Sequence, residues 1–533
     1  MSFPRARDFH LPGRSEVIAA NGMCATSHPL GAKVAVEVLE AGGNAVDAAL
    51  AGAVTLGICE PQMTGIGGDL FALIAHPDGR IEGLNASGRA PAALSAEAIR
   101  AEGHAVIPPG SAHAVTIPTA VAGIHELATT RGRIGLDRVL APAIRYADEG
   151  VPVAPRVAFD WNGAVGALKG AARTHFSFAG AAPAPGRIFR APAQAEALRR
   201  IAAEGRDGFY KGEVMEDMLG ALNALGGVHT AEDFAAAKAD WVEPVSGTYR
   251  GAELIELPPN GHGAAAILMA NIMESFDLAA LDPFGARRAH LEAEATKLAY
   301  DARDRLVADP DVAGAEGRLA KLLSKDFAAK LAALIDPERP MAHPAKTAEA
   351  VHKETIYITV VDKDRMQVSL IYSIFSNFGS GLASDRFGIL FHDRGRGFTL
   401  AEGHPNEAAG GKRPLHTIIP GLIREGGEVT RCFGVMGGPY QPNGHVRVLS
   451  NLVDYGMEPQ AALDAPRSYA TEGVLRMERG YAPEVREALA GMGHAVEAPE
   501  TAIGGAQMIT TDREMGVLRG ASDPRKDGCA LGY

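Results

Sequence analysis

Two residues with hydroxyl side chains could together form a nucleophilic site. Thr355 begins one predicted strand, and Ser373 lies near the end of the next. The run 355–361, TIYITVV, is dense in β-branched residues, which favour a strand. The polar residues 362–365 predict a hairpin turn, and 366–374 predict the returning strand. A hydroxyl at the first residue of a strand, with a second hydroxyl beside it, is unusual for an ordinary hairpin.

The register of this hairpin decides how close the two hydroxyls come. If Val361 pairs with Met366, Thr355 lies opposite Tyr372, and Ser373 is one residue away. A small adjustment of the backbone would then bring the two hydroxyls together. The alternative is a plain hairpin whose first residue is a threonine.

A cut between Glu354 and Thr355 would give this arrangement a chemical purpose. A threonine hydroxyl is a poor nucleophile without an adjacent base, and a free α-amino group on the same residue supplies one. The pKa of such an amine, about 7.7–8, leaves a neutral fraction near pH 7. We therefore expect Thr355 to be both the processing nucleophile and the catalytic nucleophile.

Further motifs follow one another along the chain: GGNAVDAA at 42–49, PQMTGIGG at 61–68, KLAY at 297–300 with DP at 309–310, GKRP at 411–414, MGG at 436–438 and DPR at 523–525. Together with TIYITVVDKD at 355–364 and FGSG at 378–381, they resemble the γ-glutamyltransferase family of N-terminal-nucleophile hydrolases. Several widely spaced motifs in the same order are hard to obtain by chance. The pattern is most similar to the branch that includes oxamate amidohydrolase.

The resemblance implies an α+β fold, the four-layer αββα sandwich. It also implies a large subunit, residues 1–354, and a small subunit, residues 355–533, that remain associated after autocatalytic cleavage. Ser373 matches the second hydroxyl residue of the family, which hydrogen-bonds the nucleophile. Gly437 and Gly438 match the oxyanion glycines, whose lack of side chains lets N–H groups approach an oxyanion closely. Without the resemblance, a glycine pair after a strand would be read as a turn.

Positions that would contact the substrate depart from the family pattern. His416 and Thr417 occupy the places of a serine pair that contacts the substrate carboxylate, and only Thr417 keeps a hydroxyl. Ser87 stands at the position of a carboxylate-binding arginine, with Arg89 two residues later. A histidine such as His416 is more often structural than a ligand.

The positions that would meet a substrate ammonium also differ. Arg394 stands where a Gln or Glu is expected, Gly397 replaces an aspartate, and Phe375 replaces an asparagine. A cation repels an ammonium but pairs with a carboxylate. Arg394, Arg396 or Arg89 could therefore bind a carboxylate, or these arginines could form structural ion pairs.

These differences favour a threonine amidohydrolase or acyltransferase acting on an amide with a small, carboxylate-bearing acyl group. A genuine γ-glutamyltransferase or glutathione hydrolase is the first alternative. An uncleaved, inactive homologue that serves as a binding protein is the second. The expected partner is a small-molecule amide, and a homo-oligomer is possible.

Composition excludes several other classes. The chain has 533 residues and a formal net charge of −12, which disfavours nucleic acid and anionic membranes as partners. Its four scattered cysteines have no metal-ligand spacing, no G-x-S-x-G elbow occurs, and no cofactor or metal is expected. The N-terminus lacks the apolar region of a secretory signal, so we expect a cytoplasmic protein.

Hydrophobic periodicity, together with the positions of glycine, proline and capping residues, predicts the remaining helices and strands. Helices are expected over 27–41 with Ser27 as N-cap, and over 44–57, 115–150, 192–225, 264–276 and 286–306. Strands are expected over 70–75, 388–391, 416–423 and 429–435. The glycines of the 64–69 turn are expected to allow close packing of backbone near the site, since a phosphate loop needs strand, loop and helix in that order. The polar stretch 336–354 is either an arm that moves after cleavage or a surface connection.

Overall fold

The computed structural model describes residue 10, residues 13–341 and residues 355–533. Glu354 and most of the predicted arm at 336–354 lie outside these residues.

Two seven-stranded sheets form the centre of the molecule, and every pairing between their neighbouring strands is antiparallel. We call the first the Thr355 sheet; its order is β19 (Cys529–Gly532), β2 (Met23–Thr26), β10 (Ile356–Val361), β11 (Gln367–Ser373), β3 (Asp69–Ala75), β4 (Ile81–Ala86) and β7 (Asp240–Val242). We call the second the Gly437 sheet; its order is β1 (Val17–Ala19), β18 (Val517–Ser522), β17 (Gly505–Asp512), β13 (Glu428–Met436), β12 (Gly421–Glu425), β9 (Ala252–Glu256) and β8 (Val245–Tyr249). Each sheet takes strands from both sides of Thr355.

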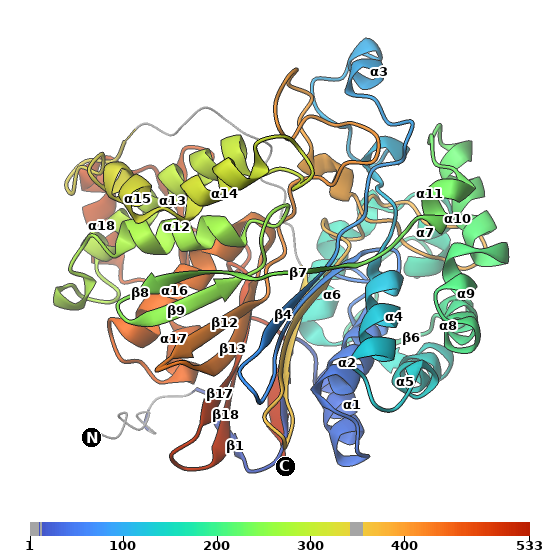
Figure 1. Cartoon of the computed structure of the whole chain (residues 1–533), viewed down its shortest axis with the longest axis horizontal. Helices are drawn as coiled ribbons and strands as arrows, with labels where there is room; N and C mark the ends of the chain where they lie inside the picture. Colours follow the sequence, from blue (N-terminus) through green and yellow to red (C-terminus); the bar gives the residue numbers. More distant parts are fainter. Residues whose placement is uncertain (1–9, 11–12, 342–354) are drawn as a thin grey trace.

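Helices cover the outer face of each sheet (Figure 1). The Thr355 sheet is covered by α1 (Pro29–Glu40), α2 (Ala45–Cys59) and α4 (Ala120–Thr130), with α5 (Leu136–Glu149) packed on α2. The Gly437 sheet is covered by α12 (Gly263–Met273), α16 (Gln441–Val453) and α17 (Pro459–Asp464), with α13 (Ala286–Leu306) packed on α12. The predicted αββα sandwich is therefore confirmed.

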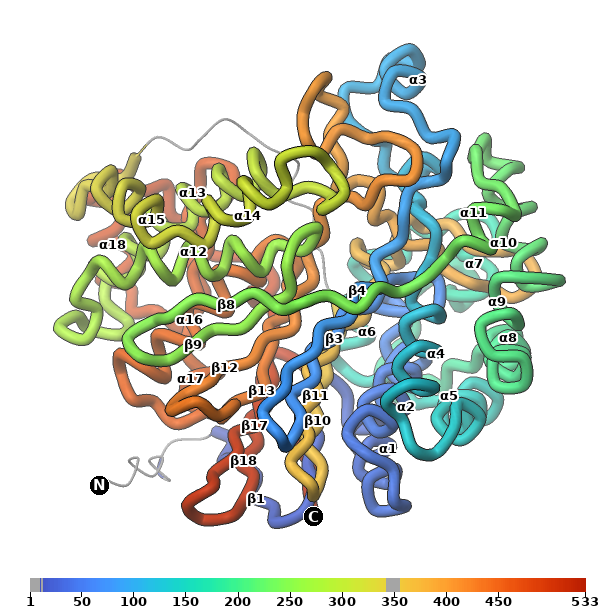
Figure 2. The backbone as a smooth tube through the Cα atoms, in the orientation of Figure 1, coloured from blue at the N-terminus to red at the C-terminus, as the bar shows by residue number. Residues whose placement is uncertain are grey.

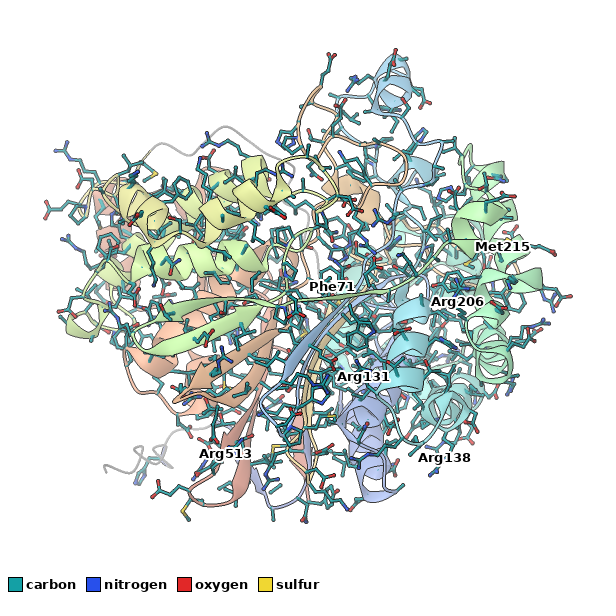
Figure 3. The ribbon with its side chains drawn as sticks, viewed as in Figure 1. Phe71, Arg131, Arg138, Arg206, Met215 and Arg513 are labelled. Atoms are coloured by element: carbon teal, nitrogen blue, oxygen red, sulfur yellow. The ribbon has the colours of Figure 1, made fainter. Side chains whose placement is uncertain are left out.

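Apolar side chains fill the space between the two sheets. Phe71, Tyr357, Ile371, Leu422 and Cys432 belong to this inner core, and all five are buried. Figure 3 shows Phe71 near the middle of the molecule, whereas Arg138 and Arg513 lie at its periphery. A closely packed apolar interior of this kind fixes the distance between the sheets, and hence between the residues at their ends.

The other elements lie around this sandwich: α3 (Ala96–Ala101), α6 (Pro155–Ala164), α7 (Gly170–Phe176), α8 (Pro192–Glu204), α9 (Asp207–Tyr210), α10 (Gly212–Ala224), α11 (Ala231–Ala235), α14 (Ala315–Leu323), α15 (Lys325–Ala332) and α18 (Pro483–Met492). Two small sheets pair β14 (Ser468–Thr471), β15 (Val474–Met477) and β16 (Val496–Glu497), and β5 (Val151–Pro152) with β6 (Ile188–Phe189). The helical stretches predicted over 115–150 and 192–225 are each divided into shorter helices, whereas those predicted over 264–276 and 286–306 match α12 and α13.

Capping side chains set the residues at which the first two predicted helices begin. Helix α2 begins after Asn44, whose side chain and that of Asp47 form a capping box, and it is buried all round as expected. The prediction of Ser27 as N-cap of α1 is wrong, because the His28 imidazole accepts from Leu30 N and Pro29 takes the first helical position. Ser27 Oγ donates instead to the buried Glu60 carboxylate.

Two predicted strands are wrong or shortened. The stretch 388–391 forms only an isolated bridge, Ala383 with Leu390, and the strand predicted over 416–423 begins only at Gly421. Before Gly421, side chains take the backbone N–H groups: Ile418 N donates to His416 Nδ1, and Ile419 N donates to Gln441 Oε1. These bonds replace the ladder that the β-branched sequence would otherwise form.

The glycine-rich turn before β3 packs as predicted. A Cβ on Gly67 would lie 2.0 Å from Leu390 O, and one on Gly68 would lie 2.2 Å from Ser373 O. No side chain fits at either position. These glycines therefore let the turn lie directly against the end of β11.

Candidate active site

The hairpin that carries Thr355 is offset by one residue from its predicted register. Ile356 pairs with Tyr372 and Val361 with Gln367, so continuing the ladder sets Thr355 opposite Ser373. The loop has three residues, because Asp362 N donates to Met366 O (3.1 Å) and Arg365 adopts φ +70°. The correction brings the two hydroxyl residues directly opposite each other without a further adjustment.

Both hydroxyl residues are buried in the uncut chain. Thr355 is 2% exposed and Ser373 is 1% exposed. Thr355 Oγ1 donates to Tyr372 O at 3.4 Å, and Ser373 Oγ accepts from Phe375 N at 2.9 Å. Ser373 is thereby held in place beside the expected nucleophile, and its role there stays a prediction.

The same face of β10 looks across the inner core toward β13. Thr359 Oγ1 donates to Cys432 O (3.4 Å), and Tyr357 packs so closely on Gly434 that a Cβ there would lie 2.3 Å from the ring. Side chains alternate along a strand, so two residues back along β10 correspond to two residues forward along β13. Thr355 therefore faces the end of β13, immediately before Gly437.

The glycine pair after β13 has the conformation of a tight turn. Gly437 has φ +128° and Gly438 has φ +55°, both in the region that favours glycine. The turn passes into the short 3₁₀ helix Gly438–Tyr440 and then into α16. The turn directly follows the end of β13 that Thr355 faces, and the oxyanion role of Gly437 and Gly438 stays a prediction.

Asp69 lies beside Ser373, on the next strand of the Thr355 sheet. Ser373 of β11 pairs with Asp69 of β3, so Thr355, Ser373 and Asp69 occupy successive strands on one face of the sheet (β10, β11 and β3 run side by side in Figure 2). With neighbouring strands about 4.8 Å apart, about 10 Å separates the first and third Cα atoms. The sequence analysis missed Asp69; a carboxylate at the start of a strand buried throughout was the available signal.

Arg394, one of the predicted substrate-binding residues, contacts Asp69 in this row. It is fully buried, with Nε 2.9 Å from Asp69 Oδ2, the second terminal nitrogen NH1 3.1 Å from Thr417 Oγ1, and its guanidinium carbon 4.3 Å from the centre of the Phe375 ring. Burial lowers the pKa of Arg394, and Asp69 opposes that shift. The remaining nitrogen, NH2, has no hydrogen-bond partner among the described residues.

Two imidazole rings contact Asp69 in addition to Arg394. Its Oδ2 lies 2.9 Å from His416 Nε2 and 3.1 Å from His392 Nδ1. Burial would raise the pKa of Asp69, but contacts with His392 and His416 outweigh it and hold the pKa well below its usual range. Asp69 is therefore ionised at neutral pH. These three neighbours all lie at its Oδ2, whereas its Oδ1 accepts from Gly88 N at 3.3 Å.

His416 serves this cluster as a neutral donor. Burial, and then the charge of Arg394, lower the pKa of His416 to about 3. Its Nδ1 accepts from Ile418 N, so its Nε2 carries the proton that is donated to Asp69, and its ring lies 4.5 Å from that of Phe71. Both ring nitrogens are engaged, which is what the structural alternative for His416 requires.

Ser87 and Arg89 are placed less favourably for a substrate. Ser87 Oγ accepts from Asn260 Nδ2 (2.9 Å), and Ser87 is fully buried. Arg89 forms ion pairs with Asp309 (3.3 Å) and Asp311 (2.9 Å). These contacts agree with the alternative that Arg89 has a structural role, and the carboxylate-binding role of both residues stays a prediction.

A cluster of metal-ligand type lies outside the site, between α13 and the residues that follow α18. His290, Glu294 and His494 place ligand atoms within 4.8 Å of one another. However, the Lys297 ammonium lies 2.7 Å from Glu294 Oε1 and takes the place of a cation, while His290 Nδ1 and His494 Nε2 are hydrogen-bonded at 2.8 Å. We assign this cluster to a hydrogen-bonded network instead of a metal centre.

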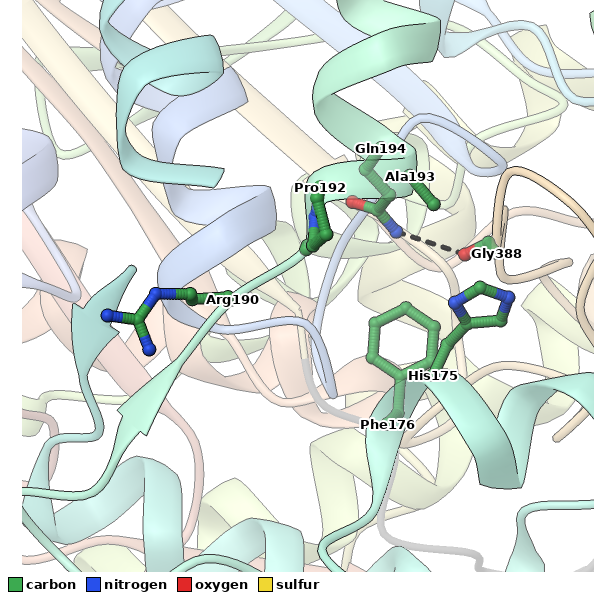
Figure 4. Close-up of a pocket in the computed structure, with 8 residues that line it drawn as sticks. His175, Phe176, Arg190, Pro192, Ala193, Gln194 and Gly388 are labelled. Atoms are coloured by element: carbon green, nitrogen blue, oxygen red, sulfur yellow. Dashed lines mark hydrogen bonds between the residues drawn. The ribbon is translucent and has the colours of Figure 1, made fainter. Parts of the chain in front are cut away.

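The described residues also enclose two cavities away from Thr355. One, of about 140 Å³, is shown in Figure 4; its lining includes His175, Phe176 and Gln194, and Gln194 Nε2 donates to Gly388 O at 3.1 Å. Arg190 points away from that pair in the same view. The other, of about 420 Å³, lies beside Lys297 and His494. None of the predicted site residues lines either cavity.

Comparison with known proteins identifies the family. The family model for gamma-glutamyltranspeptidase matches residues 31–533. The chain belongs to the γ-glutamyltranspeptidase family. It is therefore an enzyme of the hydrolase or transferase type, as the resemblance implied.

Members of the γ-glutamyltranspeptidase family match this chain along its whole length. The glutathione hydrolase-like YwrD proenzyme of Bacillus subtilis is 34% identical, over 97% of this chain and 99% of that protein. The oxamate amidohydrolase proenzyme of Klebsiella pneumoniae is 32% identical, over 97% of this chain and 100% of that protein. The crystal structure of cephalosporin acylase from Bacillus halodurans superposes with a TM-score of 0.91 at 37% identity, covering 100% of this chain and 99% of the other.

Family membership leaves the substrate open, since these relatives bear three different activity names. None of the helices in the described part of the chain is both long and apolar enough to span a bilayer.

Proposed function

We propose that this enzyme is a self-processing threonine amidohydrolase that cleaves amides of a small, carboxylate-bearing acyl group. The observation that carries the proposal is the buried guanidinium of Arg394, which lies beside the row of Thr355, Ser373 and Asp69. One of its nitrogens has no partner within residues 13–341 and 355–533. A buried cation with a free donor is a binding site for an anion.

Processing would come first. The Thr355 hydroxyl attacks the carbonyl carbon of Glu354, the C–N bond breaks, and the acyl group moves to the oxygen as an ester. Water then hydrolyses the ester, which leaves a free carboxylate on Glu354 and a free α-amino group on Thr355. Residues 1–354 and 355–533 would stay together, because both sheets contain strands from each portion.

Turnover would use the same oxygen. The α-amine takes the proton of the Thr355 hydroxyl as the oxygen attacks the substrate amide, and N–H groups of the Gly437–Gly438 turn stabilise the oxyanion. The leaving amine or ammonia receives the proton as the C–N bond breaks. Water, or an acceptor amine in the transferase version, then releases the acyl group from Thr355.

The charges around Arg394 support a substrate without an amino group. The Oδ2 of Asp69 already lies within 3.1 Å of Arg394, His392 and His416, and its Oδ1 accepts from Gly88 N. A substrate ammonium would have to compete with these neighbours for the carboxylate. The low pKa of His416, about 3, keeps that ring uncharged. A γ-glutamyl group would bring its ammonium toward Arg394, and like charges repel in a site with little water.

A direct test compares two substrates. We expect ammonia release from oxamate and little cleavage of a γ-glutamyl anilide, with Thr355→Ala inactive on both. Activity on the anilide alone would replace the proposal with γ-glutamyl hydrolysis, the activity class of the glutathione hydrolase-like relative. Intact mass and N-terminal sequencing of the same preparation would show whether the smaller fragment begins Thr-Ile-Tyr-Ile.

A further inference from the structure

Four side chains of α13, spaced four residues apart, reach the segment that forms α16 and the turn before it. Their contacts, in order along α13, are Arg288 NH2 to Ser450 Oγ (2.8 Å), Glu292 to Arg447 NH1 (2.5 Å), Thr296 Oγ1 to Asn443 Nδ2 (2.6 Å), and Tyr300 OH to Pro439 O. Residues four apart lie on one stripe of a helix. We call these four contacts the polar seam.

The polar seam is buried along most of its length. Arg288, Glu292 and Thr296 are at most 2% exposed, and their partners Arg447 and Asn443 are at most 3% exposed. Arg288 Nε also donates to Glu292 at 2.8 Å, so the carboxylate receives both cations. Buried polar groups are costly when they lose a partner, and a set of paired groups therefore defines one alignment of its two elements.

Displacement of α16 along α13 by one turn, about 5.4 Å, would break all four contacts together. The polar seam consequently fixes where α16 lies along its axis. Since α16 begins directly after Gly438–Tyr440, it also fixes the position of the glycine turn.

The last contact of the polar seam lies in that turn. Tyr300 donates its hydroxyl hydrogen to the carbonyl of Pro439, the residue after Gly438. The Tyr300 ring is itself held, with the Arg303 guanidinium 4.3 Å from its centre and the Tyr469 ring 5.9 Å away. A donor on a fixed ring restrains the 439–440 peptide, and only the 438–439 peptide separates it from the peptide that carries the Gly438 N–H.

We propose that Tyr300 is a positioning residue: through the Pro439 carbonyl it orients the N–H groups of Gly437 and Gly438 toward the oxyanion formed at Thr355. The inference rests on the proposed function. It also assigns a role to the KLAY motif, whose last residue is Tyr300. Tyr300 belongs to the portion before Thr355, and the glycine turn that it would orient belongs to the portion after it.

The test is Tyr300→Phe, which removes one hydroxyl and keeps the ring. We expect kcat per active site, counted by the burst of acyl-enzyme formation, to fall about tenfold with KM within about twofold. Outright loss of one oxyanion donor costs roughly 10²–10³-fold, and a misaligned donor retains part of that effect. Counting active sites removes any contribution from unfolded protein.

Tyr455→Phe is the matched control. It removes a hydroxyl that donates to Leu278 O at 2.8 Å, away from the glycine turn, and it keeps the ring that packs on Arg288 of the polar seam at 4.6 Å. Equal kcat per site in the two variants would overturn the inference. Hydrogen exchange of the 437–444 peptide gives a readout without substrate, and we expect faster exchange in Tyr300→Phe than in Tyr455→Phe. If the unaltered enzyme turns over no amide, the proposed function fails, whereas unchanged exchange in Tyr300→Phe refutes the positioning role by itself.

Discussion

Arg394→Lys separates the charge of Arg394 from its geometry. Nε of Arg394 donates to Asp69, one terminal nitrogen donates to Thr417, and the other has no partner among the described residues and is the proposed donor to a substrate carboxylate. A lysine has a single nitrogen, which Asp69 will hold, so the charge remains while the donor to the substrate is lost.

The size of the effect follows from one charge-assisted hydrogen bond, about 1.5–3 kcal/mol. Because about 1.4 kcal/mol corresponds to a factor of ten, kcat/KM for a carboxylate substrate should fall about 10- to 150-fold. Oxamide is the neutral counterpart of oxamate, with an amide in place of the carboxylate. We expect its kcat/KM to change little, so that the oxamate-to-oxamide ratio falls by nearly the full factor.

Arg89→Lys is the control for this experiment. Its side chain is already paired with Asp309 and Asp311, so we expect the ratio to stay that of the unaltered enzyme. A ratio unchanged in Arg394→Lys, or reduced equally in Arg89→Lys, would refute the assignment of the carboxylate site to Arg394.

Three further predictions concern cleavage, the glycine turn and pH. Thr355→Ala should leave a single full-length chain in intact-mass analysis, and two fragments would show that another group cuts the chain. Gly438→Val should lower kcat at least 100-fold, because φ +55° is strained for a β-branched residue, and full activity would remove Gly438 from the oxyanion site. Burial lowers the pKa of His28 and His229 to about 4, and burial together with Arg394 lowers that of His416 to about 3. The unfolded chain therefore binds more protons below pH about 6.5, and each histidine should cost about 1.4 kcal/mol of stability per pH unit between about 6 and 4. Glu60 and Glu458, whose pKa values are raised to about 7 and about 8, change stability in the opposite direction, so the measurement compares the unaltered enzyme with His229→Gln. An equal change in urea midpoint between pH 7 and pH 5 in the two proteins would contradict the prediction for His229.

The local sequence was sufficient to predict those helices and strands for which it carried one strong signal. Asn44 with Asp47 set the start of α2, and the β-branched run after Thr355 set β10. The hairpin register was missed by one residue because Arg365 accepts a left-handed conformation, which composition alone does not reveal. Strand and turn propensities describe average backbone preferences, and they do not show which residue of a turn adopts a positive φ.

The electrostatic centre of the site was harder to predict, because it depends on tertiary contacts. Asp69, the pair His392 and Arg394, and His416 come from three separate parts of the chain and meet only after folding. The sequence singled out Arg394 and His416 by their positions in a family pattern. Asp69, which joins them, had no motif to distinguish it from the glycine-rich turn that it ends.

The arrangement of strands on both sides of Thr355 has a consequence for how such an enzyme is made. The β10–β11 hairpin lies between β2 and β3, so neither portion contains a complete sheet. In the uncut chain, the portions find each other at the high effective concentration of a single molecule. After a cut at Thr355, recovery from unfolding becomes a bimolecular reaction between two incomplete chains. Folding would therefore have to precede cutting, and a processed enzyme that unfolds at low concentration would not return.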